Sequence, residues 1–323
     1  MPMMSIKIHP LRDDLPFGCR IEGVSHQLLQ DESVRAKLNE AFEDRGLIIF
    51  EDMEPSNAMQ VALSEVFGPL KEHPVHAVDL VDPETMAGAI EVASDPAKSD
   101  IVEIDGIRYS NWLPWHFDHC YNNELNRAGV LRVIQPAPSG GLTGFMDGID
   151  LYNAISPELR RGIEGRSIVY TMDMQFGKMR FGKPDSFRLV QLDPAMLEIA
   201  EQARTYPRAI HPATWTRKSG EKVLHVSPWM SEGIEGQEGG EGDALLEALC
   251  QEIRELGQSR AYFHEWKTTD MLIWDNWRML HSVTGCNPPH PRRMQRTTIR
   301  GDYGLGRFEN NDNGRYELLE MTL

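Results

Sequence analysis

The tripeptide His116-Phe117-Asp118 and the distant His281 have the residue types of a redox-active metal site. In an extended strand, side chains two positions apart project from the same face, so we expect the His116 imidazole and the Asp118 carboxylate to point at one spot. His281 then supplies a third ligand from a distant strand. Two histidines and one carboxylate occupy one face of an octahedron and leave the other open, which is the ligand arrangement of non-heme Fe(II) oxygenases.

By itself a His-x-Asp tripeptide is weak evidence, because it arises often by chance and its residues are usually surface or hydrogen-bonded core groups. Its surroundings strengthen it. We expect the tripeptide at the start of a strand, and His281 after an apolar strand at 271–274 and a short turn. Arg292 follows, and a guanidinium is the side chain best suited to bind a carboxylate in a bidentate way. An enzyme with a dicarboxylate co-substrate that chelates iron needs such a group.

Several longer blocks of the chain resemble one protein family. They are 46–50, 67–70, 115–118, 138–141 with Thr143, 211–212 with Leu224, 266–276, and 292–302. Together they resemble the taurine and aryloxyacetate dioxygenase family (TauD/TfdA) of Fe(II)- and 2-oxoglutarate-dependent enzymes, from about Gly18 to Gly306. The resemblance implies an α+β fold with a double-stranded β-helix (jelly-roll, cupin-like) core and flanking helices.

The resemblance also implies roles for five residues, carried over by position. His116, Asp118 and His281 resemble the family's iron ligands, whereas Thr143 and Arg292 resemble the two residues that hold the distal carboxylate of 2-oxoglutarate. Alone, Thr143 would be an ordinary strand residue and Arg292 a solvated surface charge. Their joint placement favours the functional interpretation. The implied metal is Fe(II), and the implied co-substrates are 2-oxoglutarate and O2.

The resemblance defines the primary substrate less closely. The segment from His73 to His76 resembles one that reads His-Pro-Val-Tyr in taurine dioxygenases and lines the sulfonate pocket, so His73 matches a substrate contact and His76 replaces a tyrosine. Arg296 matches the arginine that binds the substrate's anionic group, but it could equally pair with Asp118 or form a structural ion pair. We expect a small, anionic organic substrate that is hydroxylated, with C–S, C–O or C–P cleavage where the carbon bears a leaving group.

Two tryptophans and a basic segment also bear on the substrate. Trp112 stands where taurine enzymes are expected to carry an asparagine, and a bulky indole there would reshape the pocket, which argues against taurine itself. Trp229 falls at a pocket wall of the family, although ordinary apolar packing explains it nearly as well. Residues 175–188 are either a basic lid over an anionic substrate or a solvated loop.

Length and composition fit a soluble enzyme with a large core. The 323 residues are 41% hydrophobic and 25% charged, which is ordinary for a globular protein, and one domain can reach this length. We expect a single domain over residues 1–323, with 308–323 as a C-terminal tail. The net charge of −16 argues against a nucleic-acid or anionic-membrane partner, because clustered Lys and Arg bind such surfaces.

The sequence also bears on location and assembly. The four cysteines form no C-x-x-C pair, which indicates neither a disulfide framework nor a zinc knuckle. The N-terminal residues lack the apolar region of a signal peptide, and no stretch approaches the length of a membrane span. We therefore expect a cytoplasmic protein. Members of the family are often dimers or tetramers, so the resemblance implies a homo-oligomer of one of these sizes.

Apolar periodicity and turn signals predict short strands with helices packed at one end. Helices are expected at 33–44, 156–163, 195–204 and 244–256, and from Pro55 onward with Ser56 as the N-cap. Strands are expected at 46–50, 129–134, 142–146, 271–274 and 296–300. Asp105-Gly106 predicts one hairpin, and 208–210 with 222–226 predict another. A flexible Gly/Glu-rich loop is expected at 233–243.

Two other functions fit parts of the sequence. A non-catalytic jelly-roll protein could use His116, Asp118 and His281 to bind zinc, with Cys120 or Cys286 as a further ligand, although structural zinc usually takes four ligands that include paired thiolates. A hydrolase could use Cys120 or a serine beside a histidine, but the chain has no G-x-S-x-G pattern. The resemblance argues against halogenation, which in related enzymes needs a small residue in place of the Asp118 carboxylate.

Overall fold

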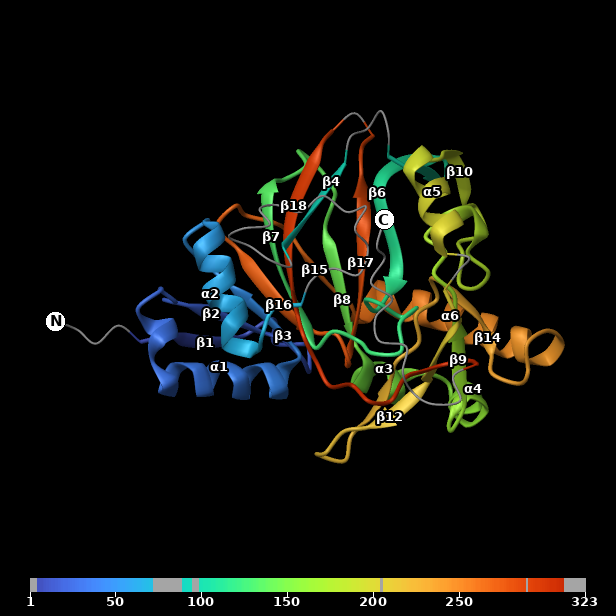
Figure 1. Ribbon diagram of the computed structural model, residues 1–323, viewed down its shortest axis with the longest axis horizontal. Helices are drawn as coiled ribbons and strands as arrows, with labels where there is room; N and C mark the ends of the chain where they lie inside the picture. Colours follow the sequence, from blue (N-terminus) through green and yellow to red (C-terminus); the bar gives the residue numbers. More distant parts are fainter. Residues whose placement is uncertain (1–4, 72–88, 95–98, 204–205, 289, 311–323) are drawn as a thin grey trace.

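Two large sheets form the centre of the molecule in the computed structural model, which describes residues 5–71, 89–94, 99–203, 206–288 and 290–310 (Figure 1). The first sheet contains, in spatial order, β1 (Lys7–Pro10), β2 (Cys19–Glu22), β3 (Leu47–Phe50), β16 (Met271–Asp275), β7 (Ala128–Gln135), β18 (Arg292–Ile299) and β4 (Ala89–Ser94). The second contains β10 (Arg188–Gln191), β5 (Ile101–Ile104), β6 (Ile107–His116), β17 (Met279–Cys286), β8 (Thr143–Asp147) and β15 (Tyr262–His264).

The two sheets pack against each other through apolar side chains that alternate in direction along each strand. Leu272 and Trp274 of β16 lie in one apolar cluster with Phe145 of β8 and Met279 of β17. Ile273, one position along, lies in a different cluster on the opposite face. Because successive strand residues face opposite sides, a single apolar run supplies both the inter-sheet core and the face that binds helices.

Helices α1 (Glu32–Arg45) and α2 (Asn57–Phe67) cover the outer face of the first sheet (Figure 1). The N-cap of α2 is Ser56, whose side chain accepts a hydrogen bond from the Met59 N–H, as predicted. Helix α1 ends at Gly46, which takes the left-handed conformation at φ 73° and is followed directly by β3. These start and stop signals confirm the predicted helix–strand–helix order.

The remaining elements lie mainly beyond the second sheet. They are η1 (Leu28–Gln30) near α1, then α3 (Gly148–Ala154), α4 (Pro157–Ile163), η2 (Phe176–Lys178), α5 (Pro194–Ala203) and α6 (Gly240–Arg260), a small sheet of β14 (Ser231–Ile234), β9 (Ser167–Tyr170), β11 (Ala209–Pro212) and β19 (Arg307–Phe308), and the hairpin β12 (Thr214–Thr216) with β13 (Lys222–Leu224). Among the described residues no helix is long and apolar enough to cross a membrane. Two facing, largely antiparallel sheets with flanking helices confirm the predicted α+β fold with a jelly-roll core.

Several local predictions are wrong. Residues 208–210 and 222–226 do not form one hairpin, because β11 pairs with β9 and β19 whereas β13 pairs with β12. The expected loop at 233–243 contains the end of β14 and the start of α6, where Glu241 and Asp243 suit the positive end of a helix. His281 does lie on a strand, as expected, but the bounds of that strand, β17, were not predicted.

Candidate metal centre

His116 and His281 lie directly opposite each other on the antiparallel strands β6 and β17. Such cross-strand pairs place their side chains on one face of a sheet, and the two imidazole centroids are 4.0 Å apart. A register shift precedes His116, because the next paired residues are Leu113 and Val283. Pro114 lies within this β-bulge, where a residue without a backbone N–H is tolerated. The bulge therefore sets which side chain of β6 faces His281.

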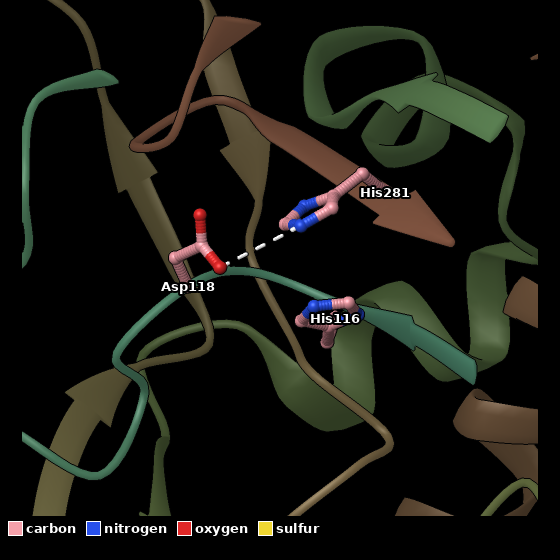
Figure 2. A group of neighbouring side chains, drawn as sticks. All are labelled: His116, Asp118 and His281. Atoms are coloured by element: carbon pink, nitrogen blue, oxygen red, sulfur yellow. Dashed lines mark ion pairs between the residues drawn. The ribbon is translucent and has the colours of Figure 1, made fainter. Parts of the chain in front are cut away.

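Asp118 lies just beyond the end of β6, so the tripeptide ends a strand rather than starting one. Simple strand alternation therefore does not explain its direction. The chain turns immediately afterwards, since His119 has a φ of 59°. The carboxylate nevertheless reaches the two histidines (Figure 2). Its Oδ1 atom is 3.6 Å from His281 Nε2, and the ligand atoms of all three residues lie within 4.8 Å of one another.

The three side chains are buried and in the protonation states that bind metals. Their exposed fractions are 4% for His116 and 7% for both Asp118 and His281. Burial lowers the pKa of His116 and His281, so both imidazoles are neutral at neutral pH. The His116 Nδ1 atom lies 2.8 Å from the Pro114 carbonyl, which fixes Nδ1 as the donor and leaves the Nε2 lone pair for a metal.

Arg296 orients the Asp118 carboxylate. Its Nη1 donates to Asp118 Oδ1 at 2.9 Å, whereas Asp118 Oδ2 is buried without a partner. Burial alone would raise the pKa of Asp118, but the charge of Arg296 holds that pKa well below its usual range. Of the roles considered for Arg296, the geometry supports the partner of Asp118 rather than a free anion clamp.

Arg292 and Thr143 lie together on facing sheets. The Arg292 Nη2 atom donates to Thr143 Oγ1 at 3.3 Å, and both side chains are buried. Burial lowers the pKa of Arg292 to about 10, so the guanidinium stays charged at neutral pH. No carboxylate of a described residue forms an ion pair with it. A buried cation without a counter-charge is costly, and a bound dicarboxylate would supply that charge.

Trp266, which precedes β16, was not singled out from the sequence. Its indole Nε1 donates to Thr143 Oγ1 at 3.0 Å. With Arg292 donating to the same oxygen, both lone pairs of the hydroxyl are occupied, so its proton is left to donate elsewhere. The block 266–276, which supported the family resemblance, held this signal.

Trp112 and Trp229 belong to one aromatic group beside the metal site. The Trp229 ring centroid is 5.1 Å from that of His116, and Phe176 contacts both tryptophans at 5.4 Å. Phe187 packs on Trp112 at 5.6 Å. The Trp229 indole N–H is buried without a partner. This aromatic group therefore contacts the candidate metal ligand His116 through Trp229.

The other residues expected to contact substrate differ in outcome. His73 and His76 lie outside the described residues. Lys71, just before them, was missed: it is only 7% exposed, and no described carboxylate lies within ion-pair distance of its ammonium. Burial lowers its pKa, Glu124 opposes this, and Arg296 is near enough for like-charge repulsion to lower it further. The signal available from the sequence was a lysine two positions before His73.

Two of the four basic residues of 175–188 are paired with carboxylates. Lys178 pairs with Asp173 at 3.1 Å, and Arg180 pairs with Asp243 at 2.6 Å. Lys183 donates to the Gly177 carbonyl. The pairing of two of these cations within the protein argues against a basic lid. The segment is not a solvated loop either, because Phe176 is buried and packs on Trp112 and Trp229.

The geometry does not favour the two rival sites. His116, Asp118 and His281 form the one group of three or more potential metal ligands within the part of the chain that the structure describes, and no cysteine belongs to it. All four cysteines are buried and unpaired. Burial raises the pKa of the Cys120 thiol, which suppresses the thiolate that a nucleophile requires.

A cavity of about 480 Å³ lies near the ligand strands but does not include the ligands. It is lined by Trp112, Trp115 and Leu113 of β6, Ser282 of β17, and Arg254 of α6, among others. Trp115 and Ser282 are chain neighbours of His116 and His281 and therefore face the other side of the sheet. Of its lining residues, Trp112 connects it to the aromatic group beside the site.

Comparison with known proteins decides the family. The sequence model of the taurine catabolism dioxygenase TauD, TfdA family matches residues 7–298. The chain belongs to this family. It is 27% identical to (S)-phenoxypropionate/alpha-ketoglutarate-dioxygenase of Sphingobium herbicidovorans over 297 residues, covering 90% of this chain and 93% of the relative. It is 23% identical to the alpha-ketoglutarate-dependent 2,4-dichlorophenoxyacetate dioxygenase of Cupriavidus pinatubonensis, covering 94% and 99%.

Solved structures share the fold. AAD-2 in complex with Mn(II) and N-oxalylglycine matches with a TM-score of 0.67 and 20% identity, covering 93% of this chain and 98% of that one. This likeness agrees with the jelly-roll arrangement of the two large sheets. As a member of the TauD/TfdA family with a buried His/Asp/His group, the protein is a 2-oxoglutarate-dependent dioxygenase.

Proposed function

We propose that the protein holds Fe(II) with His116, Asp118 and His281 and couples 2-oxoglutarate and O2 to the hydroxylation of a small anionic organic substrate. The balanced reaction converts substrate, 2-oxoglutarate and O2 into hydroxylated product, succinate and CO2. The observation that carries the proposal is the buried His/Asp/His group together with a buried Arg292 on the opposite sheet, which no carboxylate of the described residues compensates. A bound ferrous ion would supply oxygen activation.

The residues fit such an ion. Both imidazoles are neutral, His116 presents Nε2, and Asp118 keeps one buried oxygen without a partner. An ion held there would satisfy that oxygen. Arg296 compensates the Asp118 charge without occupying this oxygen. Two neutral nitrogens and one carboxylate leave coordination positions for a co-substrate.

Arg292 and Thr143 would hold the far carboxylate of 2-oxoglutarate. The guanidinium offers two parallel donors to a carboxylate, and the Thr143 hydroxyl, which already accepts from Arg292 and Trp266, donates the third hydrogen bond. The co-substrate would thereby neutralise a charge that the protein leaves buried. This predicts a preference for a dicarboxylate of fixed length over a monocarboxylate keto acid.

The surroundings of the site favour an acid with an apolar or aromatic body. Lys71 is a buried cation near Arg296, and Trp229 and Phe176 form an aromatic wall that reaches His116. The relatives named above act on phenoxypropionate and 2,4-dichlorophenoxyacetate, which combine a carboxylate with an aromatic ring. We therefore expect aryloxyalkanoate-like acids to be better substrates than taurine. If the hydroxylated carbon carries an ether or sulfonate group, the product fragments.

A substrate panel tests the proposal. Purified protein supplied with Fe(II), 2-oxoglutarate and O2 would be assayed for succinate in the presence of aryloxyalkanoates, sulfonates, sulfate esters, phosphonates and simple carboxylates. We expect substrate-dependent succinate with at least one acid and more with aryloxyalkanoates than with taurine. No stimulation by any acid would contradict the assignment of an anionic substrate.

A further inference from the structure

The side-chain amide of Asn276 forms hydrogen bonds to both the backbone N–H and the backbone carbonyl of Asp118. The Asn276 Oδ1 atom accepts from the Asp118 N–H at 2.8 Å, and Nδ2 donates to the Asp118 carbonyl at 3.1 Å. Nδ2 also donates to the carbonyl and the side chain of Asn126 at 3.2 and 3.1 Å. Asn276 is fully buried, so each of these bonds forms away from water.

Asp118 needs such a partner because the sheet no longer supplies one. The ladder between β6 and β17 reaches His116 opposite His281, and Asp118 lies two residues beyond it. A buried peptide without a hydrogen-bond partner is strongly disfavoured. The amide of Asn276 offers one acceptor and one donor, as a neighbouring strand would. Asn276 therefore continues the backbone hydrogen bonding beyond the end of β6, at the metal ligand Asp118.

Asn276 is itself fixed by its backbone. Its N–H donates to the Arg127 carbonyl at 3.0 Å, and its carbonyl lies 2.9 Å from His225 Nε2. The His225 ring stacks on Phe117, the residue between the two ligands, with centroids 3.8 Å apart. Asn276 also lies in the short connection from β16 to β17, the strand that carries His281. One residue thus links the Asp118 loop to the strand of the third ligand.

We propose that Asn276 is a positioning residue of the metal centre: it sets the place of the Asp118 carboxylate relative to the two histidines by holding both peptide groups of Asp118. The inference rests on the proposed function. Nothing in the role requires Asn276 to touch metal, co-substrate or substrate. Its loss would leave Arg296 holding one carboxylate oxygen on a backbone that is no longer fixed.

Metal binding, not turnover alone, tests this role. Wild type, Asn276→Ala and the milder Asn276→Ser would be titrated with Fe(II) under anaerobic conditions with 2-oxoglutarate, following the metal-to-ligand charge-transfer absorption. Thermal unfolding of each metal-free protein would be recorded alongside. Partners that orient metal ligands typically change affinity by about tenfold to a hundredfold when removed, so we expect the half-saturating Fe(II) concentration to rise by that factor.

Asn39→Ala is the matched control. Asn39 Nδ2 donates to two backbone carbonyls, those of Arg35 and Val66, far from the site. This variant should unfold at a lower temperature with an unchanged half-saturating Fe(II) concentration. If the folded fraction of Asn276→Ser or Asn276→Ala also showed an unchanged half-saturating Fe(II) concentration, Asn276 would have a structural role alone. That result would overturn the inference. Absence of the absorption in wild type would instead contradict the proposed function.

Discussion

Arg292 and Arg296 lie on one strand and face the same side, but their partners give them different roles. Arg296 donates to Asp118, which compensates its charge inside the protein. Among the described residues, Arg292 donates to the neutral hydroxyl of Thr143 and pairs with no carboxylate. The sequence predicted the position of both residues but left the role of Arg296 undecided between substrate and Asp118. That choice depends on a contact between two sheets, which no local pattern contains.

Replacement of Arg292 by alanine should weaken 2-oxoglutarate binding. The charge-assisted hydrogen bonds it would make contribute roughly 1.5–3 kcal/mol, so we expect the half-saturating 2-oxoglutarate concentration to rise about tenfold to a hundredfold. Steady-state succinate formation at varied 2-oxoglutarate measures this. Arg293→Ala is the control, because Arg293 is exposed and paired with Glu91. Equal co-substrate dependence in both variants would mean that Arg292 is not the anchor.

Replacement of Trp266 by phenylalanine should have a smaller effect of the same kind. It removes the donor that helps orient the Thr143 hydroxyl, and a neutral hydrogen bond contributes about 1 kcal/mol. We expect the half-saturating 2-oxoglutarate concentration to rise roughly fivefold. Trp215→Phe removes a comparable indole bond, to the Trp277 carbonyl, outside the site and should leave this value unchanged. A shift in both variants, or in neither, would contradict the role of Trp266.

At the scale of elements, the sequence predicted those with local signals. The Ser56 cap and the Asp105-Gly106 turn between β5 and β6 are confirmed. The bounds of β17, the strand expected to carry His281, were not predicted, because buried polar residues, including His281 and Ser282, interrupt its apolar pattern. The bulge at Pro114 could not be predicted either, because it is defined by the pairing of β6 with β17. The elements that build the metal site are therefore those that the sequence predicted least well.

The N-cap of α2 can be tested separately from the site. Ser56→Ala removes the acceptor of the Met59 N–H and should lower the free energy of unfolding by about 1 kcal/mol, measured by urea denaturation. Fe(II) and 2-oxoglutarate dependence should not change, since α2 packs on the outer face of the first sheet. Ser259→Ala, an exposed serine near the end of α6, should cost much less. Comparable losses in the two variants would argue against the cap.

At the scale of the whole molecule, the two sheets bring together groups that are far apart in sequence. The histidines and Thr143 come from the second sheet, and both arginines come from β18 of the first. The resemblance was informative because its sequence blocks extend over most of the chain, from about Gly18 to Gly306, and so assigned positions that spacing alone could not. The oligomeric state, the cytoplasmic location and the single-domain organisation stay predictions.

Stability should depend on pH through buried histidines, of which His211 and His225 lie outside the three metal ligands. Burial lowers the pKa of His211 to about 4 and that of His225 to about 3. An unfolded histidine titrates near 6.5, so below that pH the unfolded chain binds protons first and stability falls with decreasing pH. We expect a loss of roughly 2 kcal/mol per histidine between pH 6.5 and 5, measured by urea denaturation of the metal-free protein.

His211→Gln should reduce this dependence on pH, because it removes one of the buried histidines with a lowered pKa. The comparison requires that the variant be folded at pH 7, which circular dichroism would establish. A free energy of unfolding that is constant from pH 6.5 to 5 in wild type would show that these histidines do not titrate differently in the folded and unfolded states.

The most direct test of the central claim is the anaerobic addition of Fe(II) and 2-oxoglutarate to the metal-free protein. If His116, Asp118 and His281 hold iron that 2-oxoglutarate chelates, a visible metal-to-ligand charge-transfer absorption should develop to one iron per chain in wild type. It should be absent in Asp118→Ala and His281→Ala. Wild-type protein that retains zinc tightly and shows no absorption would contradict the account and support a non-catalytic zinc site.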